Sequence, residues 1–185
     1  MSGLLMPTRK DSLLLLLDVQ EKLVARMPDP LAIVRSVLRL TRGAKILGVP
    51  VVVSALDVDH EGPVVEDLLQ LVRGMPQFRR GAFSAMSHEG LSAELGSSGR
   101  NTLILAGLET HVAVQQTALS AMMLGYRVHV AAGAVACRGE EEGRLALRRM
   151  DRAGAQVESV EAILMQLVER ADTDEARAIA AILTS

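Results

Sequence analysis

The stretch SLLLLLDVQ, residues 12–20, decides the fold. Its leucines follow one another without interruption, so a strand buried on both faces is predicted for residues 12–17. Strands of this kind are typical of parallel sheets that helices cover on both sides. Asp18 follows directly, so the stretch predicts a central strand whose carboxyl end holds a carboxylate.

Apolar strand-like segments alternate with segments of helical period along the rest of the chain. This alternation predicts one domain over residues 1–185, an α/β fold built as a three-layer α/β/α sandwich around a mostly parallel, doubly wound sheet. Residues 74–99 are rich in Gly and Ser and are interpreted as an irregular connection with a short strand near Gln77 and Phe78. The further strands are predicted at 51–54, 102–106, 127–131 and 156–160, and the helices at 28–47, 64–72, 112–124, 140–153, 162–170 and 174–183.

Composition excludes several classes of function. The formal net charge is −2, which favours neither nucleic acid nor an anionic membrane surface as a partner. Phe78, Phe83 and Tyr126 are the only aromatic residues, too few for base stacking. The apolar run at the start is too short for a signal segment or a membrane span. Cys137 is the only cysteine, so no intrachain disulfide can form, and a cytoplasmic location is expected.

Ligands of such sheets bind at the carboxyl ends of the strands, near the point where strand order reverses. Asp18, the loop around Arg80 and the turn after Ala106 should meet there. A partly desolvated Asp18 could act as general acid or base, although a turn residue is an equal alternative. Arg80 could pair with Asp18 or hold a substrate carboxylate, although an arginine in such a connection is more often solvated.

The segment GLETHVAV, residues 107–114, is predicted to lead from a strand into a helix. A cysteine at position 113 would have its thiolate stabilised by the helix start, but Ala113 cannot perform that chemistry. His111 could act as a base, although a histidine at such a place more often caps or packs.

Two other groups are weaker candidates. Asp57, Asp59 and His60 could bind a hard cation, but no further ligand stands out and a solvated loop is preferred. Cys137 could be a reactive thiol, but a buried free cysteine is the more common case. No metal and no cofactor is expected.

The segments LLLLLDVQ, FRRGAFSA, LILAGLETHVAVQQTAL and GYRVHVAAGAVACR together resemble consecutive motifs of the isochorismatase-like (cysteine hydrolase) family. The resemblance covers nearly the whole chain, and typical members hydrolyse C–N bonds through a thioester. Their Asp, Lys and Cys correspond to Asp18, Arg80 and Ala113. Two of the three catalytic positions therefore depart from the family pattern, which rules out a cysteine-dependent amidase.

The resemblance also implies a cis peptide at Leu108–Glu109, a homo-oligomer of two or more copies and a small-molecule ligand. The pocket residues that it implies are Gln20, Phe83, Gly107, Glu109, Thr110 and His111.

Three hypotheses remain open. The first is a degenerate member that binds a small molecule or a partner without turnover. The second is a hydrolase of the enol-ether type that works without cysteine, with Asp18 as general acid or base and Arg80 on a substrate carboxylate. The third is a structural subunit whose pocket is filled by side chains such as Phe78, Phe83 and Met86.

Overall fold

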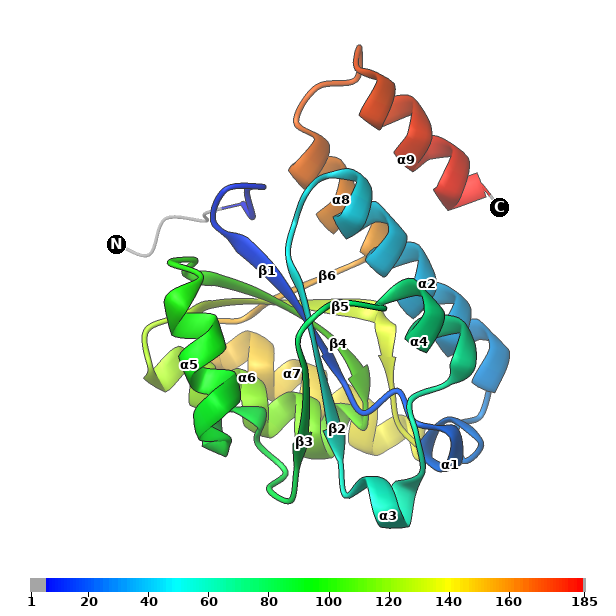
Figure 1. The fold of residues 1–185 in the computed structure, drawn as a ribbon, viewed down its shortest axis with the longest axis vertical. Coiled ribbons are helices and arrows are strands. Elements are labelled where there is room, and N and C mark those ends of the chain that lie inside the picture. Colours follow the sequence, from blue (N-terminus) through cyan, green and yellow to red (C-terminus); the bar gives the residue numbers. More distant parts are fainter. Residues whose placement is uncertain (1–5, 185) are drawn as a thin grey trace.

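The computed structural model describes residues 6–184, and a six-stranded sheet lies at their centre (Figure 1). The strand order is β3-β2-β1-β4-β5-β6, and every neighbouring pair is parallel, so the sheet is parallel throughout and not merely for the most part. The strands are β1 (Ser12–Leu17), β2 (Val51–Leu56), β3 (Gln77–Arg80), β4 (Thr102–Leu108), β5 (Arg127–Ala136) and β6 (Gln156–Glu158).

Helices cover both faces of this sheet, as the three-layer prediction requires. Figure 1 shows α5, α6 and α7 gathered on one side and α2, α4 and α8 on the other, with α9 beyond them. The α-helices are α1 (Glu21–Val24), α2 (Pro30–Ile46), α3 (Val58–Glu61), α4 (Glu66–Leu71), α5 (Glu89–Ser97), α6 (Gln115–Met123), α7 (Glu140–Ala153), α8 (Val160–Val168) and α9 (Asp174–Thr184). A short 3₁₀ turn η1 (Ala85–Ser87) and a π-helical turn η2 (Thr110–Val114) complete the set.

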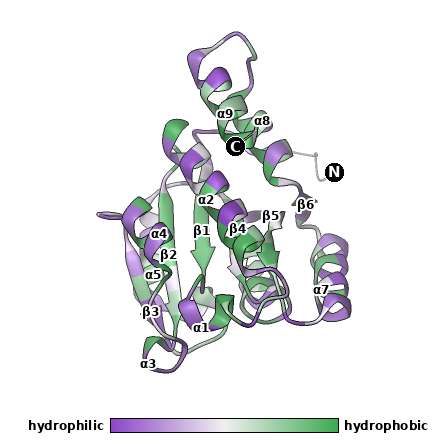
Figure 2. Ribbon diagram, turned by 90° about the vertical axis from the view of Figure 1, so that its right-hand side faces the viewer, coloured by the Kyte–Doolittle hydropathy of each residue, from purple (hydrophilic) through white to green (hydrophobic). Residues whose placement is uncertain are grey.

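The leucines of β1 supply both cores, because successive side chains of a strand point to opposite faces. Leu14 and Leu16 belong to the cluster beneath α2 and α8, whereas Leu13, Leu15 and Leu17 belong to the cluster beneath α5 and α6. All five side chains are buried. The apolar colouring of β1, β2 and β4 between more polar helices is visible in Figure 2.

Local signals explain where the longer helices begin and end. Asp29 caps α2 by accepting a hydrogen bond from the Ala32 N–H at 2.9 Å, and Pro30 occupies the first helical position. The helix α7 ends at Gly154, whose φ of 109° suits glycine, and its bounds are the predicted ones. Among residues 6–184 there is no helix of the length and apolarity that a membrane crossing requires.

Several predictions need correction, among them the following. Residues 74–99 are not one irregular connection, because they contain η1 and the helix α5 as well as β3. β5 continues to Ala136, beyond the predicted end at residue 131, and the helical segment after β4 begins at Thr110 instead of 112.

The parallel arrangement places the carboxyl ends of all strands at one edge. The chain fills the sheet from β1 outwards to β3 and then returns to build β4, β5 and β6 on the other side of β1. Strand order therefore reverses between β1 and β4, which is where such sheets bind ligands. Leu17 pairs with Gly107 at this point.

Candidate active site

Asp18 lies at the carboxyl end of β1 in a left-handed conformation with φ of 56°. Its backbone N–H donates to the Ser54 carbonyl at 2.9 Å, which ties it to the neighbouring strand β2. Its side chain is 1% exposed. The carboxylate is therefore held at a fixed position inside the protein rather than in a solvated turn.

Arg80 ends β3 and reaches across β2 to this carboxylate. Its Nη2 atom lies 2.6 Å from Oδ2 of Asp18, and its own side chain is also 1% exposed. The second terminal nitrogen, Nη1, donates to the Ala82 carbonyl at 2.7 Å. The structure thus realises one of the two alternatives for Arg80, the ion pair with Asp18, and excludes a solvated surface position.

Opposing effects set the charge state of Asp18. Burial raises the pKa of the carboxyl, whereas the Arg80 guanidinium and, to a smaller extent, the Leu56 backbone N–H lower it; burial prevails, and the pKa rises to about 6. The Oδ1 atom of Asp18 and the Nε atom of Arg80 are buried without a hydrogen-bond partner among residues 6–184. Buried polar atoms normally have a partner, so these two atoms leave hydrogen-bonding capacity unused.

Gly107 brings β4 close to β1 at this point. Its φ is 122°, and a Cβ atom at this position would lie 1.8 Å from the Leu17 carbonyl oxygen. The next peptide, Leu108–Glu109, is cis, as predicted. The π-helical turn η2 then continues directly into α6 and contains Ala113, which is 1% exposed. Ala113 thus lies buried in the turn that follows β4, the strand that pairs with β1.

Glu109 and Thr110 are both buried at the start of this turn. Glu109 Oε2 accepts hydrogen bonds from Arg138 Nε at 3.0 Å and from the Arg138 backbone N–H at 3.3 Å. Sequence analysis had not linked these two residues. The register between β4 and β5 explains the contact. Leu108 pairs with Ala136, so the residues that follow the two strands lie close together.

Gln20 lies two residues beyond Asp18 and is fully buried. Its Nε2 donates to the Leu56 and Gly62 carbonyls at 2.9 and 2.6 Å, and its Oε1 accepts from the Leu56 N–H at 2.9 Å. Both side-chain N–H groups are therefore used by the backbone. Gln20 holds the loop after β2 against the end of β1.

Two of the side chains that could have filled the pocket lie elsewhere. Phe83 is 53% exposed, so it does not fill the site. Met86 is packed in the core beneath α5. Phe78 is partly buried against the same core. His111 is half-buried, and its Nδ1 is buried without a partner among residues 6–184.

The weaker candidates have local explanations. Cys137 Sγ donates to the Gly139 carbonyl at 2.9 Å, and burial, followed by the nearby Glu109 charge, raises the pKa of the thiol. His60 is exposed on α3. Within residues 6–184 no group of three or more His, Cys, Asp or Glu side chains is arranged to hold a metal ion.

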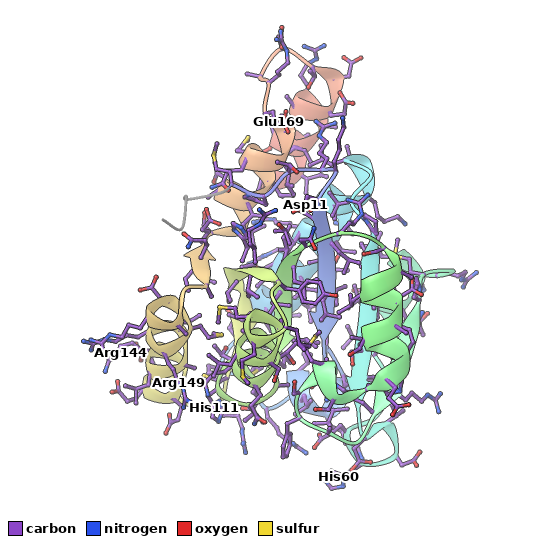
Figure 3. The ribbon with its side chains drawn as sticks, turned by 90° about the vertical axis from the view of Figure 1, so that its left-hand side faces the viewer. Asp11, His60, His111, Arg144, Arg149 and Glu169 are labelled. Carbon is purple, nitrogen blue, oxygen red and sulfur yellow. The ribbon has the colours of Figure 1, made fainter. Side chains whose placement is uncertain are left out.

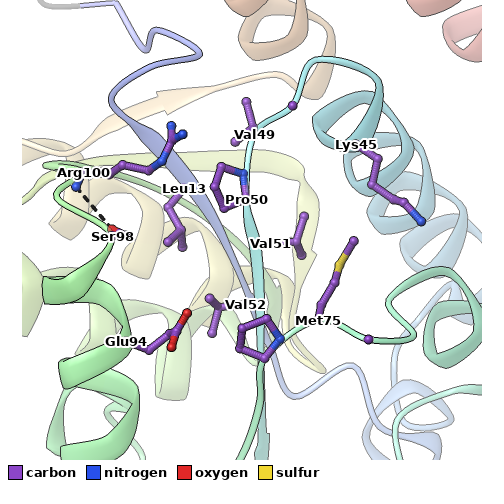
Figure 4. Close-up of a pocket in the computed structure, with 13 residues that line it drawn as sticks. Leu13, Lys45, Val49, Pro50, Val51, Val52, Met75, Glu94, Ser98 and Arg100 are labelled. Carbon is purple, nitrogen blue, oxygen red and sulfur yellow. Dashed lines mark hydrogen bonds between the residues drawn. The ribbon is translucent and has the colours of Figure 1, made fainter.

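A separate cavity of about 570 Å³ lies at the opposite edge of the sheet, where β1 and β2 begin (Figure 4). Its cations are already engaged with backbone carbonyls: Lys45 donates to Leu71, and Arg100 donates to Arg9 and Ser12. The cavity lies at the amino ends of the strands, away from Asp18, and its two cations are not free to bind a ligand.

Comparison with known proteins identifies the domain and the fold. Residues 12–162 match the isochorismatase domain model. The chain is 38% identical over 130 residues to isochorismatase domain-containing protein 1 of Salmo salar; the match covers 70% of this chain but only 46% of that relative, so the chain spans about half of its length.

Solved structures resemble the fold closely. The YcaC gene product of Escherichia coli, described as an octameric hydrolase of unknown specificity, superposes with a TM-score of 0.94 at 26% identity, over 100% of this chain and 92% of that one. YcaC from Pseudomonas aeruginosa, solved with hexane-2,5-diol and covalent acrylamide, gives a TM-score of 0.92 at 25% identity, over 100% and 96% of the two chains. Because the domain model matches residues 12–162 and the fold is shared, we conclude that this chain belongs to the isochorismatase family.

Proposed function

We propose that this protein is a hydrolase homologue that binds a small polar molecule at the Asp18–Arg80 pair without forming a thioester. The observation that carries the proposal is the combination of a buried ion pair with a methyl group at position 113. A thioester needs a thiolate. Cys137 is the only cysteine of the chain, and its raised pKa keeps it in the thiol form at neutral pH.

The unpartnered atoms of the pair support recognition of a small ligand. Asp18 Oδ1 can accept a hydrogen bond and Arg80 Nε can donate one. Small carboxamides and carboxylic acids carry a donor, an acceptor or both, so they are the ligand class that we propose. Because Arg80 stays protonated, it supplies charge and hydrogen bonds but transfers no proton.

The raised pKa of Asp18 favours a second candidate, hydrolysis without cysteine. A carboxyl with a pKa of about 6 is partly protonated near neutral pH and could donate that proton to an enol-ether substrate. Arg80 would then hold a carboxylate of the substrate. Against this candidate, Nη1 and Nη2 of Arg80 are already engaged by Ala82 and Asp18.

We also propose that the protein assembles from several copies, with the octameric YcaC relative as support. A purely structural subunit of such an assembly is the third candidate. A single domain over residues 1–185 and a cytoplasmic location stay proposals as well.

Ligand binding and turnover can be tested together. Thermal unfolding is measured with small carboxamides and carboxylic acids, and hydrolysis of amides and enol-ether carboxylates is followed in parallel. We expect a ligand that raises the melting temperature of the wild type but not of Asp18→Asn, without hydrolysis. Asp11→Asn, which removes a carboxylate at the other end of β1, is the control and should keep the ligand response.

Each opposite result has a clear meaning. Hydrolysis by the wild type that disappears in Asp18→Asn would replace ligand binding with the cysteine-independent hydrolase. A melting temperature that no compound changes, together with the absence of hydrolysis, would contradict both and leave the structural subunit.

A further inference from the structure

The outer side of α7 has a charge pattern that the candidate site does not use. Three glutamates, residues 140–142, form its first turn, and Arg148, Arg149 and Arg152 lie in its second half. Leu145 lies between the two groups and is 50% exposed. Figure 3 shows Arg144 and Arg149 pointing away from the sheet at the outer edge of the molecule.

Most of these charges lack a partner within the chain. Arg144 pairs with Glu141, with Nη2 to Oε1 at 2.5 Å and Nε to Oε2 at 2.8 Å. Arg148, Arg149 and Arg152 form no ion pair or side-chain hydrogen bond with any of residues 6–184. The helix dipole explains acidic residues in the first turn and Arg152 in the last turn. It does not explain two adjacent arginines in the third turn beside an exposed leucine.

Helical geometry makes this side of α7 complementary to itself. At about 100° per residue, Glu141 and Arg148 lie on one flank of Leu145, and Glu142 and Arg149 lie on the other. Leu145 is midway between the acidic and basic members of each flank. If a second α7 lies antiparallel across a two-fold axis at Leu145, each glutamate therefore faces an arginine of opposite charge on the same flank.

We propose that α7 is an interface between two copies of this chain, packed antiparallel with Leu145 at the centre. Glu142 would meet Arg149 of the partner subunit, and Glu141, which already pairs with Arg144 of its own chain, would share its charge with Arg148 of the partner subunit. The inference rests on the proposal that the protein assembles, and it names the surface involved. A foreign acidic partner fits less well, because the glutamates of the first turn would repel it.

Charge reversal tests this interface in the full-length protein. Sedimentation velocity is measured at about 50 mM salt, where surface charges are weakly screened. We expect Arg148→Glu/Arg149→Glu and Glu141→Arg/Glu142→Arg each to weaken association at least about 10-fold, because like charges then face each other. A mixture of the two variants should associate again, since one carries only acidic and the other only basic residues at these four positions.

A matched control and a second measurement keep the test decisive. Arg35→Glu/Arg42→Glu, on exposed positions of α2, should leave association unchanged. In a Cys137→Ser background, Leu145→Cys should form a disulfide-linked dimer on oxidation, because the two-fold axis brings the two thiols together. Circular dichroism verifies that each variant is folded.

The outcomes separate the two proposals. A wild type that stays monomeric at every concentration would overturn both the assembly and this interface. An oligomeric wild type whose charge variants associate normally, and whose Leu145→Cys variant does not cross-link, would overturn the interface alone.

Discussion

Arg80 Nη2 lies 2.6 Å from Asp18 Oδ2, and each of the two side chains is only 1% exposed to solvent. The two residues differ in one respect that determines how a substitution of each affects stability. A carboxyl group that loses its counter-charge can take up a proton, whereas a guanidinium cannot lose one.

Arg80→Gln should therefore destabilise the protein more than Asp18→Asn above about pH 6. Removing Arg80 takes away the positive charge that lowers the pKa of Asp18, so the cost should be small at pH 5, where the carboxyl is protonated, and grow towards pH 8 as a buried carboxylate is left without a counter-charge. Asp18→Asn replaces the carboxyl by a neutral amide, much as protonation does in the wild type, so its cost should not grow over this range. Urea unfolding at both pH values measures this. Arg127→Gln, which breaks the partly exposed ion pair with Asp11, should cost less than about 1 kcal/mol. Equal losses for the two buried variants at pH 8 would contradict the prediction.

The raised pKa of Asp18 also predicts how stability depends on pH. The folded protein holds this proton up to about pH 6, whereas the unfolded chain releases it near the ordinary value of 3.8. The stabilisation is therefore complete below about pH 3.8 and lost as the pH rises through 6. For a shift of about two units it amounts to roughly 3 kcal/mol. The free energy of unfolding, measured between pH 4 and 7, should show this decline in the wild type relative to Asp18→Asn. Parallel curves would show that Asp18 does not titrate in this range.

Gly107→Ala should be strongly destabilising. An added Cβ would lie 1.8 Å from the Leu17 carbonyl oxygen in a backbone conformation with φ of 122°. Steric overlap and backbone strain together should cost about 4 kcal/mol or more. Gly48→Ala is the matched control, since its φ is 67° but no atom lies within 4 Å of the added Cβ; it should cost about 1 kcal/mol. Urea unfolding compares the two, and similar losses would disprove the close contact.

Restoring the residues of the family pattern should restore covalent chemistry. Ala113→Cys supplies a thiol, and Arg80→Lys supplies a group that can transfer a proton. We expect the double variant to hydrolyse small amides at least about 10-fold faster than the wild type. This increase is smaller than the rate enhancement that general acid–base catalysis typically contributes. Ala113→Cys alone should stay near the background rate. Ala118→Cys with Arg80→Lys places the thiol elsewhere along the same helical segment and should be inactive. Folded double variants without added hydrolysis would refute the assignment of these positions.

Sequence could predict most of the fold because its strongest signals were local. The bounds of β1 and α7 follow from an uninterrupted apolar run and from a helical stripe ended by Gly154. The helix α5 was missed because Gly90 and Gly96, together with its serines, have low helix propensity. It forms nevertheless, since the side chains of Leu91 and Leu95 are fully buried and tertiary packing overrides propensity.

The candidate site was predictable only where topology determines it. The meeting of Asp18 with Arg80 follows from strands that end at the same edge of a parallel sheet. The bond between Glu109 and Arg138 depends on the register between β4 and β5, which periodicity does not provide. The three backbone hydrogen bonds of Gln20 depend on how the loop after β2 closes.

The position of β3 at the end of the strand order has a consequence for motion in the site. Asp18 continues β1, whose amides lie in the interior of the sheet and should exchange with solvent only when the whole protein unfolds. Arg80 ends a four-residue strand that has a neighbour on one side only. Local opening of the ion pair should therefore begin with the detachment of β3 from β2, so the arginine departs while the carboxylate stays in place. Hydrogen exchange should accordingly be fast at residues 77–80 and slow at residues 13–17.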